Sequence, residues 1–260
     1  MKKILAVTIL ILLAAGKIFA QNVTEIAEGS KILVLNYHQI QNKSTSLSIP
    51  LADFDAQMRY LSSQGYISIT PEELYSGLSG ELELPKKPVL ITFDDGYADN
   101  YTNAFPILQR YGMRATIFII PAFVGVYQNY LTWDEILEMQ DGGITFESHT
   151  MHHYKLEELP DDEIRSELLN SKQTLEEHLG QPVEFLAYPT GTYNLHIAGI
   201  AKEVGYKGAF TIKYGNVDLG SNFYALERVP IFNTAEHTMK NFYERIDYRQ
   251  SFEEFGWTKK

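Results

Sequence analysis

Two spacings of apolar residues alternate along the chain after residue 30. Short, nearly continuous apolar runs are typical of strands buried in a parallel sheet. Longer segments place apolar residues three or four positions apart, as Phe54, Met58 and Leu61 do, and this spacing is typical of amphipathic helices. The runs predict strands at 31–38, 66–69, 88–93, 114–120, 144–149, 183–188, 206–212 and 224–232. The helical spacing predicts helices at 50–65, 70–78, 97–111, 132–143, 160–180, 195–205 and 234–246.

The order of these elements predicts a single α/β domain. Strands and helices alternate with no intervening linker rich in Ser, Pro or Gly, which favours one parallel sheet. Because the strand–helix unit recurs seven or eight times, a closed or nearly closed (β/α) barrel is favoured, and a doubly wound sandwich is the alternative. In both folds ligands bind at the carboxyl ends of the strands.

The first twenty residues are predicted to be a signal peptide. Lys2 and Lys3 precede an apolar run that is shorter than the ~20 residues of a transmembrane helix, and Ala20 offers a cleavage site. We therefore expect a secreted or periplasmic protein whose mature domain is 21–260, with a retained membrane anchor as the alternative.

Composition and charge limit the partners. The chain has 260 residues and no cysteine, so a metal ion would have to be held by His and carboxylate side chains. Without the three lysines of the leader, 19 basic residues face 33 acidic ones, a net charge of −14. That charge argues against nucleic acid and anionic membranes as partners. We expect a monomer.

Unusual polar residues stand at the ends of several predicted strands. They are Asp94 and Asp95, His149, His38, and the segment "YPTGTY" that begins at Tyr188. Because the carboxyl ends of parallel strands meet at one rim, these residues are expected to lie together.

This group of side chains indicates a divalent metal site. His149 and His153 are four residues apart, so one helical turn or a tight loop could direct both rings inward. Two imidazoles and the carboxylate of Asp95 would form a facial ligand set for Zn²⁺ or a similar ion. Asp94 could then stay ionised beside the ion, with Gly96 allowing the bend that brings both carboxylates to the rim. A surface turn with spare histidines is the alternative.

Such a site is typical of a hydrolase. A bound ion lowers the pKa of water and polarises a carbonyl, and a neighbouring carboxylate is a suitable general base. The sequence contains no Gly-x-Ser-x-Gly elbow, Walker loop or dinucleotide fingerprint. Residue chemistry alone therefore predicts metal-dependent hydrolysis without naming a substrate.

The segments "TFDDGYADNYTNAFPIL", "SHTMHH" and "AYPTGTY", in this order, make residues 31–231 resemble the polysaccharide deacetylases, the NodB-homology group of carbohydrate esterase family 4. The segments "YH", "LPKKPVLITFDDGY" and "TWDEI" make the chain most similar to the exported deacetylases of poly-N-acetylglucosamine.

The resemblance implies a distorted (β/α) barrel of about seven strands. It implies a divalent metal, usually zinc, with Co²⁺ or Ni²⁺ as alternatives, held by Asp95, His149 and His153. Asp94 would be the catalytic base that deprotonates water. The substrate of such an enzyme would be an N-acetylated polysaccharide, from which acetate is released.

The "YPTGTY" segment would supply the contacts to substrate and oxyanion. The resemblance places Tyr188, Pro189 and Thr190 there, with a backbone N–H near Thr190 stabilising the oxyanion.

The sequence departs from the family pattern at three places. Ala187 stands where the family usually has an Arg that pairs with the catalytic base, and Arg228 is our substitute, with a surface ion pair as the alternative. No C-terminal leucine-plus-histidine motif is evident, so His38 is our catalytic acid, and His237 is expected at the surface of a helix. Tyr154 replaces a Pro, which we expect to be harmless.

Aromatic rings near the predicted strand ends could contact sugar. The candidates are Tyr127, Tyr130, Trp133, Tyr188 and Tyr193, with core packing as the alternative for each. Trp133 is expected to pack at a helix start.

Besides a purely structural cell-surface protein, for which the rim cluster would be accidental, three functions remain open at this stage. The first is N-deacetylation of an extracellular N-acetylglucosamine polymer. An O-acetyl esterase acting on xylan would use the same site, and a non-catalytic carbohydrate-binding homologue is the third.

Overall fold

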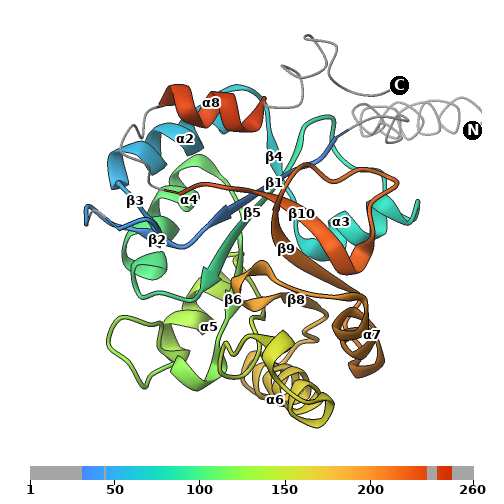
Figure 1. Ribbon diagram of the computed structural model, residues 1–260. Helices are drawn as coiled ribbons and strands as arrows, with labels where there is room; N and C mark the ends of the chain where they lie inside the picture. The colour runs from blue at the N-terminus through green and yellow to red at the C-terminus, as the bar shows by residue number, and fades with distance from the viewer. Residues whose placement is uncertain (1–30, 44, 233–238, 248–260) are drawn as a thin grey trace, which may run out of the picture.

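Seven parallel strands close into a barrel in the computed structural model, which describes residues 31–43, 45–232 and 239–247. The barrel strands are β1 (Leu33–Tyr37), β5 (Pro88–Asp95), β6 (Thr116–Ile119), β7 (Thr145–Ser148), β8 (Phe185–Ala187), β9 (Gly208–Tyr214) and β10 (Leu226–Pro230). The ring is complete because β1 pairs with β10 on one side and with β5 on the other (Figure 1). The (β/α) barrel is therefore confirmed, and the doubly wound sandwich is wrong.

Three short strands lie outside this ring. β4 (Ile67–Ser68) pairs with the beginning of β5, while β2 (Gln39–Ile40) and β3 (Ser48–Ile49) form a separate two-stranded sheet.

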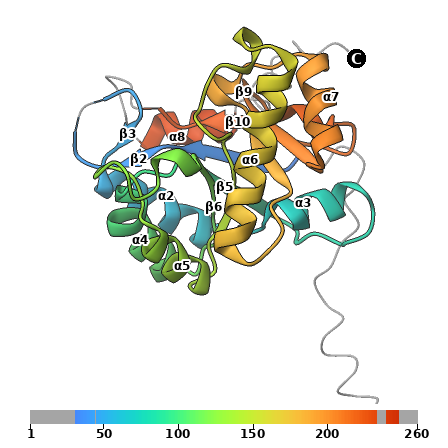
Figure 2. The same ribbon diagram turned by 90° about the horizontal axis from the view of Figure 1, so that it is seen from below.

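The α-helices surround the barrel, as the two views in Figures 1 and 2 show. They are α2 (Leu51–Ser63), α3 (Pro71–Leu78), α4 (Phe105–Tyr111), α5 (Trp133–Asp141), α6 (Asp161–Leu179), α7 (Leu195–Val204) and α8 (Met239–Ile246). No helix in the described part of the chain is long and apolar enough to cross a membrane.

Local sequence explains where several helices begin and end. Thr70 and Thr132 each accept a hydrogen bond from the backbone three residues on, and a Glu reciprocates, so both form capping boxes. Gly112 and Gly180 adopt the left-handed conformation that ends α4 and α6.

One predicted helix begins later than expected. The segment predicted as helical from residue 97 starts as a π-helix at Asn100–Ala104 and continues into α4. The preceding strand is longer than predicted, because β5 runs through both aspartates to Asp95.

The barrel interior is apolar toward one end and polar toward the other. Alternation along β5 places Leu90, Thr92 and Asp94 on one face, and Leu90 belongs to the apolar cluster inside the barrel. The same alternation on β1 places Val34 in that cluster and Asn36 after it. The polar members therefore gather at the carboxyl ends of the strands.

Three expectations fall outside the described residues. These are the leader at 1–20, His237, and the beginning of the helix predicted at 234–246.

Candidate active site

The carboxylate of Asp94 is buried at the end of β5 and receives three hydrogen bonds. Arg228 donates from Nη1 to Oδ1 at 2.7 Å and from Nη2 to Oδ2 at 2.7 Å. Asn36 donates from Nδ2 to Oδ2 at 2.9 Å. The two-pronged contact fixes the plane of the carboxylate, because the guanidinium fork matches both of its oxygens.

Arg228 itself is held by the barrel interior. Its side chain is 0% exposed, its Nε donates to the Thr211 carbonyl at 2.8 Å, and its Nη1 donates to the Thr92 hydroxyl at 3.1 Å. The guanidinium also lies 5.6 Å from the centre of the Phe118 ring. The expected alternative, a surface ion pair, is therefore wrong.

The electrostatics of Asp94 follow from this pairing. Burial, the largest single effect, would raise the pKa of Asp94. The charge and hydrogen bonds of Arg228, together with the nearby His149 and His38, outweigh it and hold that pKa below its usual range. Asp94 is consequently ionised at neutral pH.

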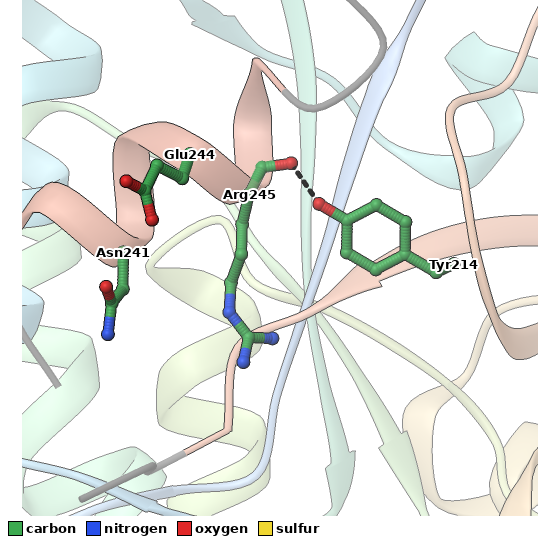
Figure 3. Close-up of a pocket in the computed structure, with 4 residues that line it drawn as sticks. All are labelled: Tyr214, Asn241, Glu244 and Arg245. Carbon is green, nitrogen blue, oxygen red and sulfur yellow. Dashed lines mark hydrogen bonds between the residues drawn. The ribbon is translucent and has the colours of Figure 1, made fainter. Parts of the chain in front are cut away.

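Helix α8 is tied to the strand that carries Arg228. Figure 3 shows the hydroxyl of Tyr214, at the end of β9, donating to the carbonyl of Arg245. The Arg245 side chain in turn donates to the carbonyl of Pro230 at the end of β10. The open pocket in that figure is lined by Tyr214, Asn241, Glu244 and Arg245, and none of these belongs to the Asp94 group.

A second cluster next to Asp94 consists of Asp95, His149 and His153. Both imidazole Nε2 atoms lie 3.5 Å from Asp95 Oδ1, and one ligand atom from each residue falls within 4.8 Å of the others. His149 is oriented by a 2.7 Å contact between its Nδ1 and the carbonyl of Ala187. That contact sets Nδ1 as the protonated nitrogen and leaves Nε2 free to act as a ligand.

A tight loop, rather than a helical turn, brings the two imidazoles together. Thr150 and His153 have positive φ angles of 64° and 62°, and the Thr150 hydroxyl accepts a hydrogen bond from the His153 N–H at 3.1 Å. His152, between them, turns away and contacts Glu167 at 2.6 Å.

Backbone strain is concentrated at this rim. The non-glycine residues with positive φ in the described part of the chain are Asp95, Thr150, His153 and Thr190. Such conformations are costly for residues with a Cβ and persist where the surrounding structure enforces them. The bend that we expected from Gly96 alone begins one residue earlier, since Asp95 has φ 76° and Gly96 has φ 79°.

His38 lies at the same rim, after β1. Burial lowers its pKa, while the negative charges of Asp94 and Asp95 act in the opposite direction, which places the ring within electrostatic reach of both. Its Nδ1 is buried with no hydrogen-bond partner among the described residues. The ring lies 5.9 Å from that of Phe232.

In the segment after β8, Tyr188 packs into the interior. This side chain is 0% exposed, its hydroxyl donates to the Tyr224 carbonyl at 3.1 Å, and its ring stacks on Tyr193 at 5.1 Å. For the Tyr188 ring, core packing, the stated alternative to a sugar contact, is what the structure shows. Pro189 is buried, whereas Thr190 is exposed with φ 58°.

An aromatic row extends from the Asp95 cluster to solvent. The ring of Tyr97 stacks on Tyr130 at 5.0 Å, and Tyr127 lies 6.1 Å beyond and is 52% exposed. Two backbone hydrogen bonds join the Tyr127–Tyr130 loop to the residues after Asp95, from Ala98 to Asn129 and from Leu131 to Gly96.

Trp133 and His178 form a stack away from this row. Their ring centres are 3.8 Å apart, so Trp133 packs at the start of α5 as predicted.

The donor set of the cluster fits a divalent metal. One carboxylate and two imidazoles match the ligands of catalytic zinc sites, which leave a position open for water or substrate. Burial lowers the pKa of His153 to about 4, so this ring is neutral at pH 7, the form that binds metal. Asp95, His149 and His153 could therefore hold such an ion.

Sequence reasoning missed Asn36 and Tyr97. A signal for Asn36 was present, because it is an amide in an otherwise apolar run and shares its strand face with His38, two residues later. The contact between Tyr97 and Tyr130 could not be read from the sequence, because it depends on the path of a loop.

The fold and the site define a class: a barrel hydrolase whose rim could hold a divalent metal. The family model described as polysaccharide deacetylase matches residues 81–209. YxkH of Bacillus subtilis, whose name assigns it to the same family, is 38% identical over 202 residues, covering 78% of this chain and 72% of YxkH. The chain belongs to the polysaccharide deacetylase family, as its motifs had indicated.

Relatives with more specific names cover similar shares of the chain. A poly-β-1,6-N-acetyl-D-glucosamine N-deacetylase of Staphylococcus aureus is 30% identical over 241 residues, covering 81% of this chain and 82% of the relative. Among solved structures, Streptococcus pyogenes deacetylase PplD in complex with acetate has a TM-score of 0.78 and 31% identity, covering 84% of this chain and 98% of PplD. IcaB from Ammonifex degensii has a TM-score of 0.70 and 28% identity, covering 78% of this chain and 93% of IcaB.

Proposed function

We propose that this protein is a metal-dependent deacetylase that hydrolyses N-acetyl groups of an extracellular N-acetylglucosamine-containing polysaccharide and releases acetate. One observation carries the proposal: an ionised, arginine-held carboxylate, Asp94, lies next to a three-residue set suited to a divalent metal. The N-deacetylase relative from Staphylococcus aureus supports the choice of substrate.

Asp95, His149 and His153 would hold the ion, which we propose is Zn²⁺, with Co²⁺ or Ni²⁺ as substitutes. When bound, it would lower the pKa of water and polarise the acetyl carbonyl. The negative charge of Asp95 and the neutral ring of His153 suit this role.

Asp94 would act as the general base. Its Oδ2 already accepts from both Arg228 and Asn36, whereas its Oδ1 accepts from Arg228 alone. Oδ1 therefore has the free lone pair that would take the proton of the attacking water as the new bond from oxygen to the carbonyl carbon forms.

His38 would act as the general acid. The bond from carbon to nitrogen breaks as His38 delivers a proton to the sugar amine, and acetate leaves. A backbone N–H near Thr190, which is an exposed residue, would donate to the developing oxyanion.

The row of Tyr97, Tyr130 and Tyr127 would support neighbouring sugar residues. Its rings offer apolar faces next to the metal cluster, and the net acidic chain suits a neutral polymer better than an anionic one. We propose that the protein acts as a monomer after export by its leader.

Two measurements test the proposal. Protein lacking residues 1–20 should release acetate from N-acetylglucosamine oligomers, and a chelator should abolish the release. Acetate from acetylated xylan alone would favour the O-acetyl esterase. Sugar binding that survives chelation, without turnover, would favour a non-catalytic homologue.

Substitutions then distinguish the proposed roles of Asp94 and Asp95. Asp94→Asn should abolish turnover while bound metal stays near one equivalent, and Asp95→Ala should lose the metal. Asp161→Asn, at an exposed helix start, is the matched control and should change neither. Equal metal content in wild type and Asp95→Ala would contradict the ligand assignment.

A further inference from the structure

A polar face of the π-helix holds the backbone that follows β1. Asn100 donates from Nδ2 to the His38 carbonyl at 2.8 Å, and Asn103 donates from Nδ2 to the Ile40 carbonyl at 2.7 Å. Asp99 Oδ1 accepts from the Ile40 N–H at 3.0 Å. We call these three side chains, Asp99, Asn100 and Asn103, the clamp. They make hydrogen bonds to backbone groups of His38 and Ile40, as a neighbouring strand would.

The clamp is built into the widened part of the helix. The Phe105 N–H bonds to the Asn100 carbonyl, five residues back, which defines the π-turn. Asn100 is 0% exposed, and its Nδ2 also lies 3.1 Å from Asp99 Oδ1. A buried amide is costly unless its hydrogen bonds are made. Nδ2 makes two, to His38 and Asp99, whereas the buried Oδ1 has no hydrogen-bond partner among the described residues.

His38 needs an external support of this kind. Its Nδ1 has no hydrogen-bond partner among the described residues, so no such bond at that nitrogen orients the ring. The strands on its C-terminal side, β2 and β3, are only two residues long each. The position of the ring is therefore determined by packing and by the backbone, and the clamp fixes that backbone.

We infer that Asp99, Asn100 and Asn103 are positioning residues that hold His38 where it can protonate the leaving group. This inference rests on the proposed function, in which His38 is the acid. One continuous segment, 94–103, then carries the base and a metal ligand and also places the acid, so a single loop sets the geometry between acid and base.

Substrates with different leaving groups test this role. An amine or a sugar alkoxide must be protonated to leave, whereas the phenolate of 4-nitrophenyl acetate leaves without an acid. Asn100→Ala and Asn103→Ala should lower kcat for N-acetylglucosamine oligomers by ~10–100-fold, part of the ~10²–10⁴-fold that general acid catalysis supplies. KM, bound zinc and hydrolysis of 4-nitrophenyl acetate should remain within about twofold, because the base and ligands are untouched.

Four further variants show how large the effect can be and whether it is specific. His38→Ala should lose oligomer hydrolysis and keep hydrolysis of the aryl ester. Asp99→Asn retains an oxygen that can accept from Ile40 and should keep more activity than Asp99→Ala. Thr102→Ala, on the exposed side of the same helix, is the matched control and should behave as wild type.

Unaltered oligomer hydrolysis in the clamp variants, or equal loss on both substrates, would overturn the inference. If Asn100→Ala fails to fold, Asn103→Ala decides alone, because that residue is only partly buried. A wild type active only on acetylated xylan would sink the proposed substrate but not the clamp, since the same comparison then uses xylan. A wild type that hydrolyses only the aryl ester would refute the acid role and the clamp with it.

Discussion

Two buried carboxyl groups in this barrel have opposite protonation behaviour. Asp94 on β5 faces a guanidinium and has a lowered pKa. Glu147 on β7 accepts two backbone hydrogen bonds, from Glu184 and Phe185 at 2.9 Å each, and burial raises its pKa to about 8. Burial is similar for both, so the partner decides: a fixed opposite charge keeps the carboxylate ionised, and two neutral dipoles do not.

The difference in pKa indicates that the two carboxyl groups have different roles. An ionised carboxylate at the rim can accept a proton from water, whereas a carboxyl that is largely protonated at pH 7 cannot serve as a base there. Glu147 instead secures the start of β8, the strand whose Ala187 carbonyl orients His149.

The largest expected effect comes from removing the charge that keeps Asp94 ionised. Arg228→Met should abolish measurable acetate release and lower the free energy of unfolding by about 3–5 kcal/mol, because Asp94 would be left as a buried charge without its partner. Activity assays and urea unfolding at pH 7 measure the two effects. Arg110→Met, which breaks an exposed pair with Asp55, is the control and should cost at most about 1 kcal/mol. A similar loss in both variants would show that Arg228 matters no more to Asp94 than an exposed arginine matters to Asp55.

A smaller effect is expected from the second donor to Asp94. Asn36→Ala removes the hydrogen bond to Oδ2 but leaves Arg228 in place, so kcat should fall about tenfold, the scale of one hydrogen bond to a charged group. Loss of a donor to the ionised form raises the pKa of Asp94, so the acidic limb of the pH–rate profile should move to higher pH. A profile that stays in place, or moves to lower pH, would show that Asn36 does not act on the base.

The smallest effect concerns stability alone, at Glu147. A carboxyl whose folded pKa is raised from 4.5 to about 8 binds a proton on folding between those values, so its contribution to stability is full below pH 4.5 and is lost as pH rises toward 8. Glu147→Gln keeps an oxygen acceptor and cannot ionise. Thermal unfolding of this variant should match wild type near pH 4.5 and show a higher Tm at pH 8. A difference that shrinks as pH rises would reverse the assignment.

The sequence predicted the order of elements and the residues that gather at the rim. These depend on local periodicity and on the rule that parallel strands share an edge, so they can be read from a chain. The burial of Arg228 could not be read in this way, because its partner Asp94 comes from β5 and the two meet only when the barrel closes. The left-handed backbone of Asp95 was also missed, because the glycine that follows it, Gly96, already accounted for the expected bend.

The closure of the barrel also has a consequence for how this molecule matures. β1 is bonded both to β5 and to β10, so the earliest strand finds its final neighbour only after the last one has been synthesised. Such long-range pairing is slow, because much chain entropy is lost before the contact is gained. A nascent chain that stops short of Arg228 would hold both aspartates without the guanidinium that keeps one of them charged. Catalytic activity should therefore appear in a single step at the end of folding, and incompletely synthesised chains should be inactive.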